Sequence, residues 1–235
     1  MLMACGLLGL WCSVPGDVDG LRVGEPTTTA FIDLRRDTAQ ATGHTLVVER
    51  SWRAFDDISV HLRRTVMMAE DFRFVRHHGV EWGTVLRATW RNLTLRDEIG
   101  GSTITQQLAK NLFLSPERSL GRKGRELLIA GRLEAALSKR RIFELYLNVV
   151  EWGEGVFGAE AAARHWFGVS AAALSPAQAA RLAVTLPAPR VRDPRTLDAA
   201  LTAHAATLLR RLARNAMLTQ AELATALDDL QPSHP

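Results

Sequence analysis

One short stretch, residues 100–111 (Gly-Gly-Ser-Thr-Ile-Thr-Gln-Gln-Leu-Ala-Lys-Asn), combines a pair of glycines with the start of a two-sided helix. The glycines permit a sharp or left-handed backbone, and Thr103 followed by Gln106 makes the T-x-x-Q capping box of a helix N-terminus. At about 100° per residue, Ile104 and Leu108 fall on one face of this helix and the polar residues on the other. The stretch therefore predicts a loop that leads into a helix with one packed face and one polar face.

The polar face of this predicted helix is a candidate binding surface. A hydroxyl, two amides and an ammonium beside free N-terminal amides suit an anionic, oxygen-rich ligand such as a sugar phosphate. These groups belong to Thr103, Gln106, Gln107 and Lys110. The alternative is an ordinary amphipathic helix whose polar side is only solvated.

The composition indicates a globular chain with a mild positive charge. Its 235 residues are 47% hydrophobic, which suits one large domain, or one domain with a small lobe, around a sizeable core. The net charge of +4 is too small to indicate nucleic acid binding but is compatible with anionic lipid or phosphate nearby. Both cysteines, Cys5 and Cys12, lie near the N-terminus, so the rest of the chain has no disulfide and no thiolate metal site.

Three successive regions are expected. Residues 1–14 are apolar and uncharged, shorter than the about 20 residues that span a bilayer, and without the basic start of a secretory signal. We expect a short or truncated membrane anchor there; the alternative is a hydrophobic arm packed on the domain. Residues 15–50 are expected to form a linker and an extended lead-in, with β-leaning pieces at 31–32 and 45–48, before the main domain at 51–235.

Helical periodicity dominates the main domain and predicts a mainly α fold. An apolar stripe that starts at residue 59 has Glu70 at its edge. Residues 82–95 form an aromatic-rich amphipathic piece, which is either core or a surface that dips into a membrane interface. Residues 122–148 are one long helix-friendly segment, and a capping box at 175–178 starts further helices.

Two carboxylates, Glu70 and Glu126, are candidates for chemistry. Glu126 points along the apolar stripe of its segment, where a carboxylate needs a partner, and Arg122 and Lys123 lie one turn earlier on that side. A buried ion pair that only fixes the helix is the alternative. Carboxylate pairs perform glycosyl chemistry. The cations Lys110, Arg122 and Lys123 would stabilise a departing phosphate or pyrophosphate, which favours transfer from an activated sugar over hydrolysis.

Other kinds of site are disfavoured. His77 and His78 are adjacent instead of spaced as H-x-x-x-H, so they do not easily face one ion, even with Glu70 and Asp71 nearby. The sequence has no G-x-S-x-G elbow, no P-loop and no Rossmann fingerprint.

Four ordered blocks resemble the peptidoglycan glycosyltransferases, most closely the monofunctional biosynthetic kind without a transpeptidase domain. Residues 70–79 fit E-D-x-x-F-x-x-H-x-G, residues 100–111 fit G-G-S-T-I-T-Q-Q-x-x-K-N, residues 122–126 fit R-K-x-x-E, and residues 146–148 with the glycines after them fit the next block. The likeness spans about residues 26–195.

The resemblance implies polymerisation of lipid II with inversion. Glu70 would be the general base that takes the proton from the acceptor 4-hydroxyl, and undecaprenyl pyrophosphate would leave as a β-1,4 linkage forms. Glu126 would orient the donor phosphate region, directly or through a divalent cation (Mg²⁺ or Mn²⁺), and no organic cofactor is implied. The substrate-binding residues implied by the blocks are Asp71, Phe74, His77, Gly101, Ser102, Thr103, Gln106, Gln107, Lys110, Asn111, Arg122, Lys123 and Asn148.

The fold implied by the resemblance is lysozyme-like, with a head, a membrane-facing jaw that includes residues 82–95, and Glu70 and Glu126 converging across one groove. The implied location is the bacterial inner membrane, with the catalytic domain on its periplasmic or external face. The implied partners are lipid II, the growing glycan chain, the membrane, and cell-wall synthesis and division proteins, without nucleic acid. Two alternatives remain open: a lysozyme-like peptidoglycan hydrolase, and an inactive membrane scaffold of the cell-wall machinery.

Overall fold

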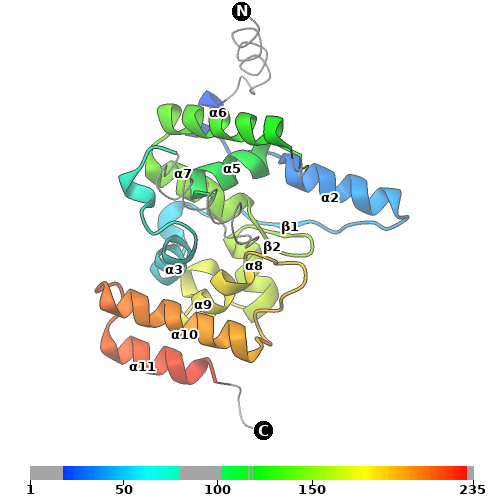
Figure 1. The fold of residues 1–235 in the computed structure, drawn as a ribbon. Coiled ribbons are helices and arrows are strands. Elements are labelled where there is room, and N and C mark those ends of the chain that lie inside the picture. Colours follow the sequence, from blue (N-terminus) through cyan, green and yellow to red (C-terminus); the bar gives the residue numbers. More distant parts are fainter. Residues whose placement is uncertain (1–17, 80–101, 116, 118, 232–235) are drawn as a thin grey trace, which may run out of the picture. The chain divides into compact units, whose positions relative to one another are not determined.

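Helices make up most of the fold. The computed structural model describes residues 18–79, 102–115, 117 and 119–231. Within these residues it has nine α-helices and one small three-stranded sheet (Figure 1). The predicted mainly α class is confirmed at this level.

The described residues form two compact units, each assembled from two separate stretches of the chain. Unit 1 combines residues of Met1–Leu46 with residues of Arg73–Val149. Unit 2 combines Val47–Phe72 with residues of Val150–Pro235. The chain therefore passes between the units three times.

Unit 1 is organised around a central helix, α5, which packs against three others. Leu108 of α5, Ile129 of α6 and Leu145 of α7 are fully buried and form much of its core. The elements of unit 1 are the 3₁₀ turns η1 (Asp19–Arg22) and η3 (Phe74–Arg76) and the helices α2 (Ala30–Ala41), α5 (Ile104–Phe113), α6 (Leu120–Ala136) and α7 (Lys139–Val149).

Helix α2 shows that the predicted β-leaning piece at residues 31–32 is wrong. The side chain of Thr29 caps the helix by accepting a hydrogen bond from the backbone N–H of Ile32 at 3.1 Å, and Ile32 itself is buried. The Arg, Ala and Gln residues that follow are good helix formers. A local cap and one buried contact thus outweigh the β preference of the Phe-Ile pair.

The helix-friendly segment at residues 122–148 is two helices rather than one. Leu137 is extended, with φ −121° and ψ 149°, so α6 ends before it. The side chain of Ser138 then accepts a hydrogen bond from the backbone N–H of Arg141 at 3.2 Å, which starts α7.

Unit 2 contains a short sheet and a helical cluster. The sheet has the order β1-β3-β2, with β1 parallel and β2 antiparallel to β3, so the lead-in contributes a strand just after the predicted residues 45–48. The turns η2 and η4 cover Phe55–Asp57 and Ala171–Ala173. The other elements are β1 (Glu49–Arg50), β2 (Glu151–Gly153), β3 (Val156–Phe157), α3 (Val60–Glu70), α8 (Ala159–Phe167), α9 (Pro176–Thr185), α10 (Ala199–Arg214) and α11 (Gln220–Asp229).

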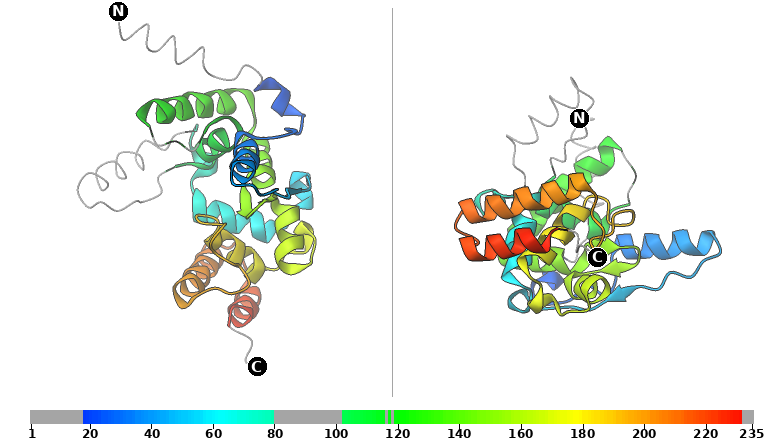
Figure 2. Two further views of the ribbon diagram at one scale, coloured as in Figure 1. Left: turned by 90° about the vertical axis from the view of Figure 1, so that its right-hand side faces the viewer. Right: turned by 90° about the horizontal axis from the view of Figure 1, so that it is seen from below.

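Helix α3 is held by helices from the C-terminal part of the chain. It packs on α9 and α10, and Leu62 and Val66 on its inner face are fully buried. Helices α10 and α11 lie side by side in both views of Figure 2, in agreement with their packing. The predicted capping box before α9 is confirmed, with Ser175 and Gln178 each bonded to the backbone N–H of the other.

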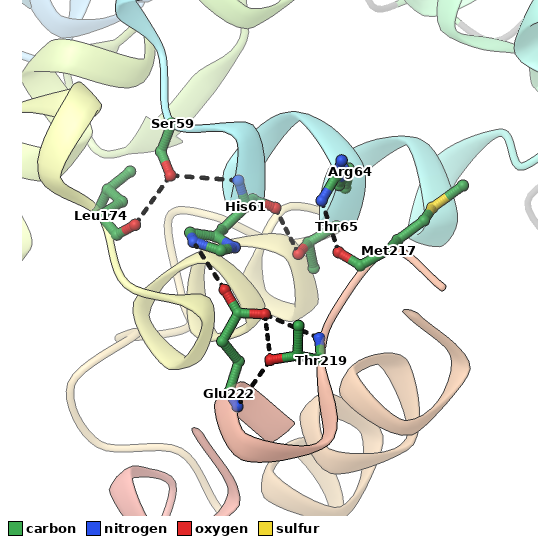
Figure 3. A network of polar contacts seen from close by, with 8 residues as sticks. All are labelled: Ser59, His61, Arg64, Thr65, Leu174, Met217, Thr219 and Glu222. Atoms are coloured by element: carbon green, nitrogen blue, oxygen red, sulfur yellow. Dashed lines mark hydrogen bonds and ion pairs between the residues drawn. The ribbon is translucent and has the colours of Figure 1, made fainter. Parts of the chain in front are cut away.

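A polar network ties the start of α3 to the turn between α10 and α11 (Figure 3). Arg64 donates a hydrogen bond to the carbonyl of Met217 at 2.7 Å, and Nε2 of His61 lies 4.0 Å from Glu222. Burial lowers the pKa of His61, and the attraction of Glu222 only partly opposes this effect. Hydrogen bonds from Thr219, the N-cap of α11, lower the pKa of Glu222.

No helix within the described ranges is both long enough and apolar enough to cross a bilayer. The predicted anchor at residues 1–14 and the aromatic-rich piece at residues 82–95 lie outside the described residues.

Candidate functional site

The predicted site residues divide between the two units. Glu70 and Asp71 belong to unit 2, and Gly101 lies outside the described residues. Glu70 and Glu126 belong to different units, and their convergence across one groove stays a prediction. Unit 1 holds the remaining positions: Phe74, His77, Ser102, Thr103, Gln106, Gln107, Lys110, Asn111, Arg122, Lys123, Glu126 and Asn148.

Glu70 is the last residue of α3 and is half-buried. The next residue, Asp71, is only 7% exposed, and its backbone N–H donates to the carbonyl of Met67 at 3.0 Å. The two carboxylates therefore sit where the chain leaves a firmly packed helix, immediately before it passes from unit 2 to unit 1.

The capping box of α5 is confirmed, and it is buried. The backbone N–H of Thr103 donates to Gln106 Oε1 at 3.3 Å, and the backbone N–H of Gln106 donates to Thr103 Oγ1 at 3.2 Å. Thr103 Oγ1 also donates to the carbonyl of Gly79 at 2.6 Å. These side chains hold the helix start and so do not form the open polar face that the sequence suggested.

The backbone conformation at Gly79 explains why the first block ends in glycine. Its φ of +81° is unfavourable for other residues, and an added Cβ would lie 3.1 Å from Cγ of Glu134. Its carbonyl receives the Thr103 hydroxyl, so the first block is joined directly to the second within unit 1.

The third block contains a buried ion-pair cluster, as predicted for Glu126. This carboxylate is 2% exposed, and it accepts from Arg122 Nη1 at 2.7 Å and from Lys123 Nζ. Lys123 Nζ also donates to Ser102 Oγ at 3.2 Å. Lys123 thus links the loop before α5 to α6, and the second block to the third.

The position of these cations in α6 is electrostatically unusual. Ser119 caps the helix, and the first turn carries no acidic residue, although acidic residues are favoured at the positive end of a helix dipole. Arg122 and Lys123 are there instead, at a cost of about 0.3–1 kcal/mol each. Glu126 offsets only one of the two charges, so the start of α6 keeps a net positive charge that suits an anion.

The fourth block also contacts the second. Tyr146 is fully buried, and its hydroxyl donates to Gln107 Oε1 at 3.1 Å. Asn111 and Asn148 are buried, and their side-chain amides donate at 2.8 Å to the carbonyls of Gln107 and Glu144, one turn earlier in their helices. Both asparagines therefore have a local structural role.

Phe74 is 1% exposed and belongs to an aromatic core. Its ring lies 5.7 Å from that of Phe143 and 6.2 Å from that of His77, and Lys139 Nζ lies 4.3 Å from its centroid. The structure therefore shows Phe74 as a packing residue in the core of unit 1, with the ring of His77 edge-to-face against it.

The sequence analysis missed Glu134, which joins three helices of unit 1. It accepts from Thr105 of α5 and, at 2.7 Å, from Lys139 of α7. Its side chain is only 7% exposed. A local signal existed, because a glutamate so close to Leu133 lies near the buried stripe of α6, but its partners come from other helices.

Unit 2 has a comparable cluster away from the predicted site residues. Glu160 is 1% exposed and accepts from Arg53 and Arg164 at 2.9 Å and from the backbone N–H of Ala171 at 2.8 Å. The Arg53 hydrogen bond is the main cause that lowers the pKa of Glu160 to about 2. The cluster joins α8 to the segment after β1, through Arg53, and to η4, through Ala171.

The described residues do not build a metal site by themselves. No three His, Cys, Asp or Glu side chains gather in the described part of the chain. Both oxygens of Glu126 accept hydrogen bonds from cations, so this carboxylate is placed to balance positive charge.

Comparison with known proteins identifies the family. The transglycosylase family model matches residues 38–213. The biosynthetic peptidoglycan transglycosylase of Aromatoleum aromaticum is 50% identical over 188 residues, which cover 80% of this chain and 81% of that protein. The protein of the same name from an Azoarcus species is 47% identical over 215 residues, 91% and 93% of the two chains. The chain therefore belongs to the transglycosylase family.

Proposed function

We propose that the chain is a peptidoglycan glycosyltransferase that polymerises lipid II into β-1,4-linked glycan strands. Its relatives are named biosynthetic peptidoglycan transglycosylases. The observation that carries the proposal is the cluster of Arg122, Lys123 and Glu126 at the start of α6. Two cations, one carboxylate and a helix N-terminus suit a pyrophosphate better than a neutral sugar leaving group.

In the proposed reaction, the 4-hydroxyl of the acceptor lipid II attacks the anomeric carbon of the growing glycan. Glu70 takes the hydroxyl proton as the new glycosidic bond forms. The bond between the anomeric carbon and the pyrophosphate breaks, and undecaprenyl pyrophosphate leaves from the opposite side. The α-linked donor thus becomes a β-1,4 linkage.

The residues of unit 1 would hold the donor. Arg122 and Lys123 would neutralise the pyrophosphate as charge develops on it, together with Lys110 of α5. Glu126 would keep the first two side chains in place, because each of them is ion-paired to this buried carboxylate. Ser102 and Gln107 are half-buried polar groups that would contact the sugars, whereas Thr103 and Gln106 support the start of α5.

A divalent cation remains part of the proposal only as a counter-ion of the pyrophosphate oxygens. No step above is assigned to it, and no group of three His, Cys, Asp or Glu side chains that could hold an ion is found among the described residues. Activity with and without EDTA, followed by titration with Mg²⁺ or Mn²⁺, measures that requirement.

We also infer a lysozyme-like arrangement of two lobes and a place at the outer face of the bacterial plasma membrane. The peptidoglycan chemistry in the names of its relatives supports a role in the cell envelope. Lipid II and the growing glycan would be its substrates, and cell-wall synthesis and division proteins its candidate partners.

The test is polymerisation of labelled lipid II by the purified protein. Glu70→Gln should keep the fold but reduce the rate by about 10²–10⁴-fold, because the general base is lost. Glu154→Gln, at a position whose side chain is 66% exposed in unit 2, is the matched control and should keep full activity. Undiminished polymer from the Glu70 variant would end the assignment of the base.

A parallel assay separates synthesis from hydrolysis. Purified sacculi incubated with the protein should release no muropeptides. Release of muropeptides without polymer formation would instead identify a lysozyme-like hydrolase, and neither activity would favour a scaffold.

A further inference from the structure

Helix α2 places an aromatic ring beside one of the candidate site residues. Nζ of Lys110, on α5, lies 5.4 Å from the centroid of the Phe31 ring. Phe31 belongs to none of the four motif blocks and lies in the region expected to be a linker. The contact therefore connects a segment without an assigned role to the polar residues of the second block.

The ring is held in place by its own helix. Thr29 caps α2, the adjacent Ile32 is 1% exposed, and α2 packs directly on α5. Arg35, one turn further along α2, lies 5.9 Å from the same ring. Phe31 thus has a defined position relative to α5 and presents its π-system to cations.

The distance allows a cation–π interaction, in which the negative face of an aromatic ring attracts an ammonium within about 6 Å. A lysine ammonium is carried on a flexible four-carbon stem and loses rotamer freedom when it is fixed. A ring that restricts this stem before substrate arrives lowers the ordering cost of binding an anion. For this effect, residue 31 must be aromatic and not only of the right size.

A simpler reading is that Phe31 only packs α2 against α5. Lys110 also lies in the last turn of α5, where a cation interacts favourably with the helix dipole. The two readings differ in one respect. Packing is largely kept by an aliphatic side chain of similar size, whereas the attraction to the ammonium requires an aromatic ring.

We propose that Phe31 is a positioning residue that orients the ammonium of Lys110 for the donor pyrophosphate. This inference rests on the proposed function, because it assigns Lys110 to that group. It gives α2 a role in the reaction through α5, without contact between Phe31 and the substrate.

The experiment measures kcat and KM for lipid II with Phe31→Leu and Phe31→Tyr. We expect Phe31→Leu to lower kcat/KM by about 3–10-fold, the range of a partly exposed cation–π contact. Phe31→Tyr keeps an aromatic ring and should retain at least half of the wild-type kcat/KM. Arg36→Gln, at an exposed position on the same helix, is the control and should leave kcat/KM unchanged.

A double-mutant cycle removes the contribution of packing. In a Lys110→Met background, Phe31→Leu should have no further effect on kcat/KM, and thermal unfolding of each variant reports any loss of fold. Equal losses with Leu and Tyr, or a full Phe31→Leu effect in the Lys110→Met background, would overturn the positioning role. Failure of the proposed function is distinguishable, because then the wild-type protein itself would form no polymer from lipid II.

Discussion

Glu126 and Glu160 are both nearly fully buried carboxylates, and each is paired with two cations. Their surroundings differ. Glu126 lies in the first turns of a helix whose start keeps a net positive charge. Glu160 also accepts a backbone N–H, and its arginines, Arg53 and Arg164, are 41% and 60% exposed. The same pairing thus serves a candidate anion site in unit 1 and internal structure in unit 2.

Glu160 gives a prediction about acid stability. Its pKa is about 2 in the folded chain, below the ordinary 4.5, so the ionised form stabilises the fold. This contribution is fully present above pH about 4.5 and is lost as the pH falls toward about 2. Thermal melts between pH 7 and pH 2 should show Glu160→Gln less stable than the wild type near neutrality, with the gap closing in acid.

A neutral control is Glu154→Gln, whose melting temperature should follow the wild type at every pH because its side chain is 66% exposed. A constant gap between wild type and Glu160→Gln down to pH about 2 would contradict the role of ionisation.

The turn between α10 and α11 is a Schellman motif with an unusual residue at its left-handed position. The backbone N–H of Met217 donates to Leu212 at 2.9 Å and that of Ala216 to Ala213 at 3.1 Å. Ala216 has φ 54°, a conformation that glycine adopts without the steric cost of a Cβ. The turn with alanine at position 216 is therefore less stable than the same turn with glycine at that position would be.

We expect Ala216→Gly to stabilise the chain. Relief of the left-handed strain, less the entropy that glycine adds to the unfolded chain, leaves a gain of about 0.5–1 kcal/mol, or a rise in Tm of about 1–4 °C. Ala203→Gly, at an exposed position inside α10, should instead cost about 1 kcal/mol. Calorimetry of both variants checks the pair, and a loss of stability in both would contradict the strain.

Helix starts were the most predictable elements, because a cap is a local arrangement of few residues. The boxes at Thr103–Gln106 and Ser175–Gln178 are confirmed. The pairing of Glu126 was also predictable, since its partners lie one turn earlier.

Interactions across the chain were not predictable in this way. The link from Thr105 to Glu134 spans 29 residues, and that from Tyr146 to Gln107 spans 39. The burial of Gln106 depends on the elements that cover it. Two-residue strands such as Glu49–Arg50 are too short to show the alternation of apolar and polar residues that predicts a strand. They form only when their partner strands are in place.

The whole molecule is interleaved, because unit 2 takes its first stretch from residues 47–72 and the rest from beyond residue 149. A chain ending at Val149 would keep α3 but lack α9 and α10, which cover Leu62 and Val66. We expect α3 to be poorly protected in that fragment.

Limited trypsin digestion with mass spectrometry measures this difference. Cleavage after Arg63 or Arg64 should be at least about tenfold faster in the fragment than in the full chain. Cleavage after Arg132 of α6 is the internal control, since its own unit is complete in both. Equal protection at Arg63 would show that α3 does not depend on the later helices.

The interleaving also sets an order of events at the ribosome. Helix α3 emerges before α9 and α10, and the apolar face that they cover stays exposed until residues 176–214 have been translated. Nascent chains therefore expose an apolar surface that chaperones can bind until α9 and α10 have been made. The helix that ends in Glu70 gains its packing partners only after α9 and α10 have been translated, so copies that terminate before them lack the contacts that hold that carboxylate in place.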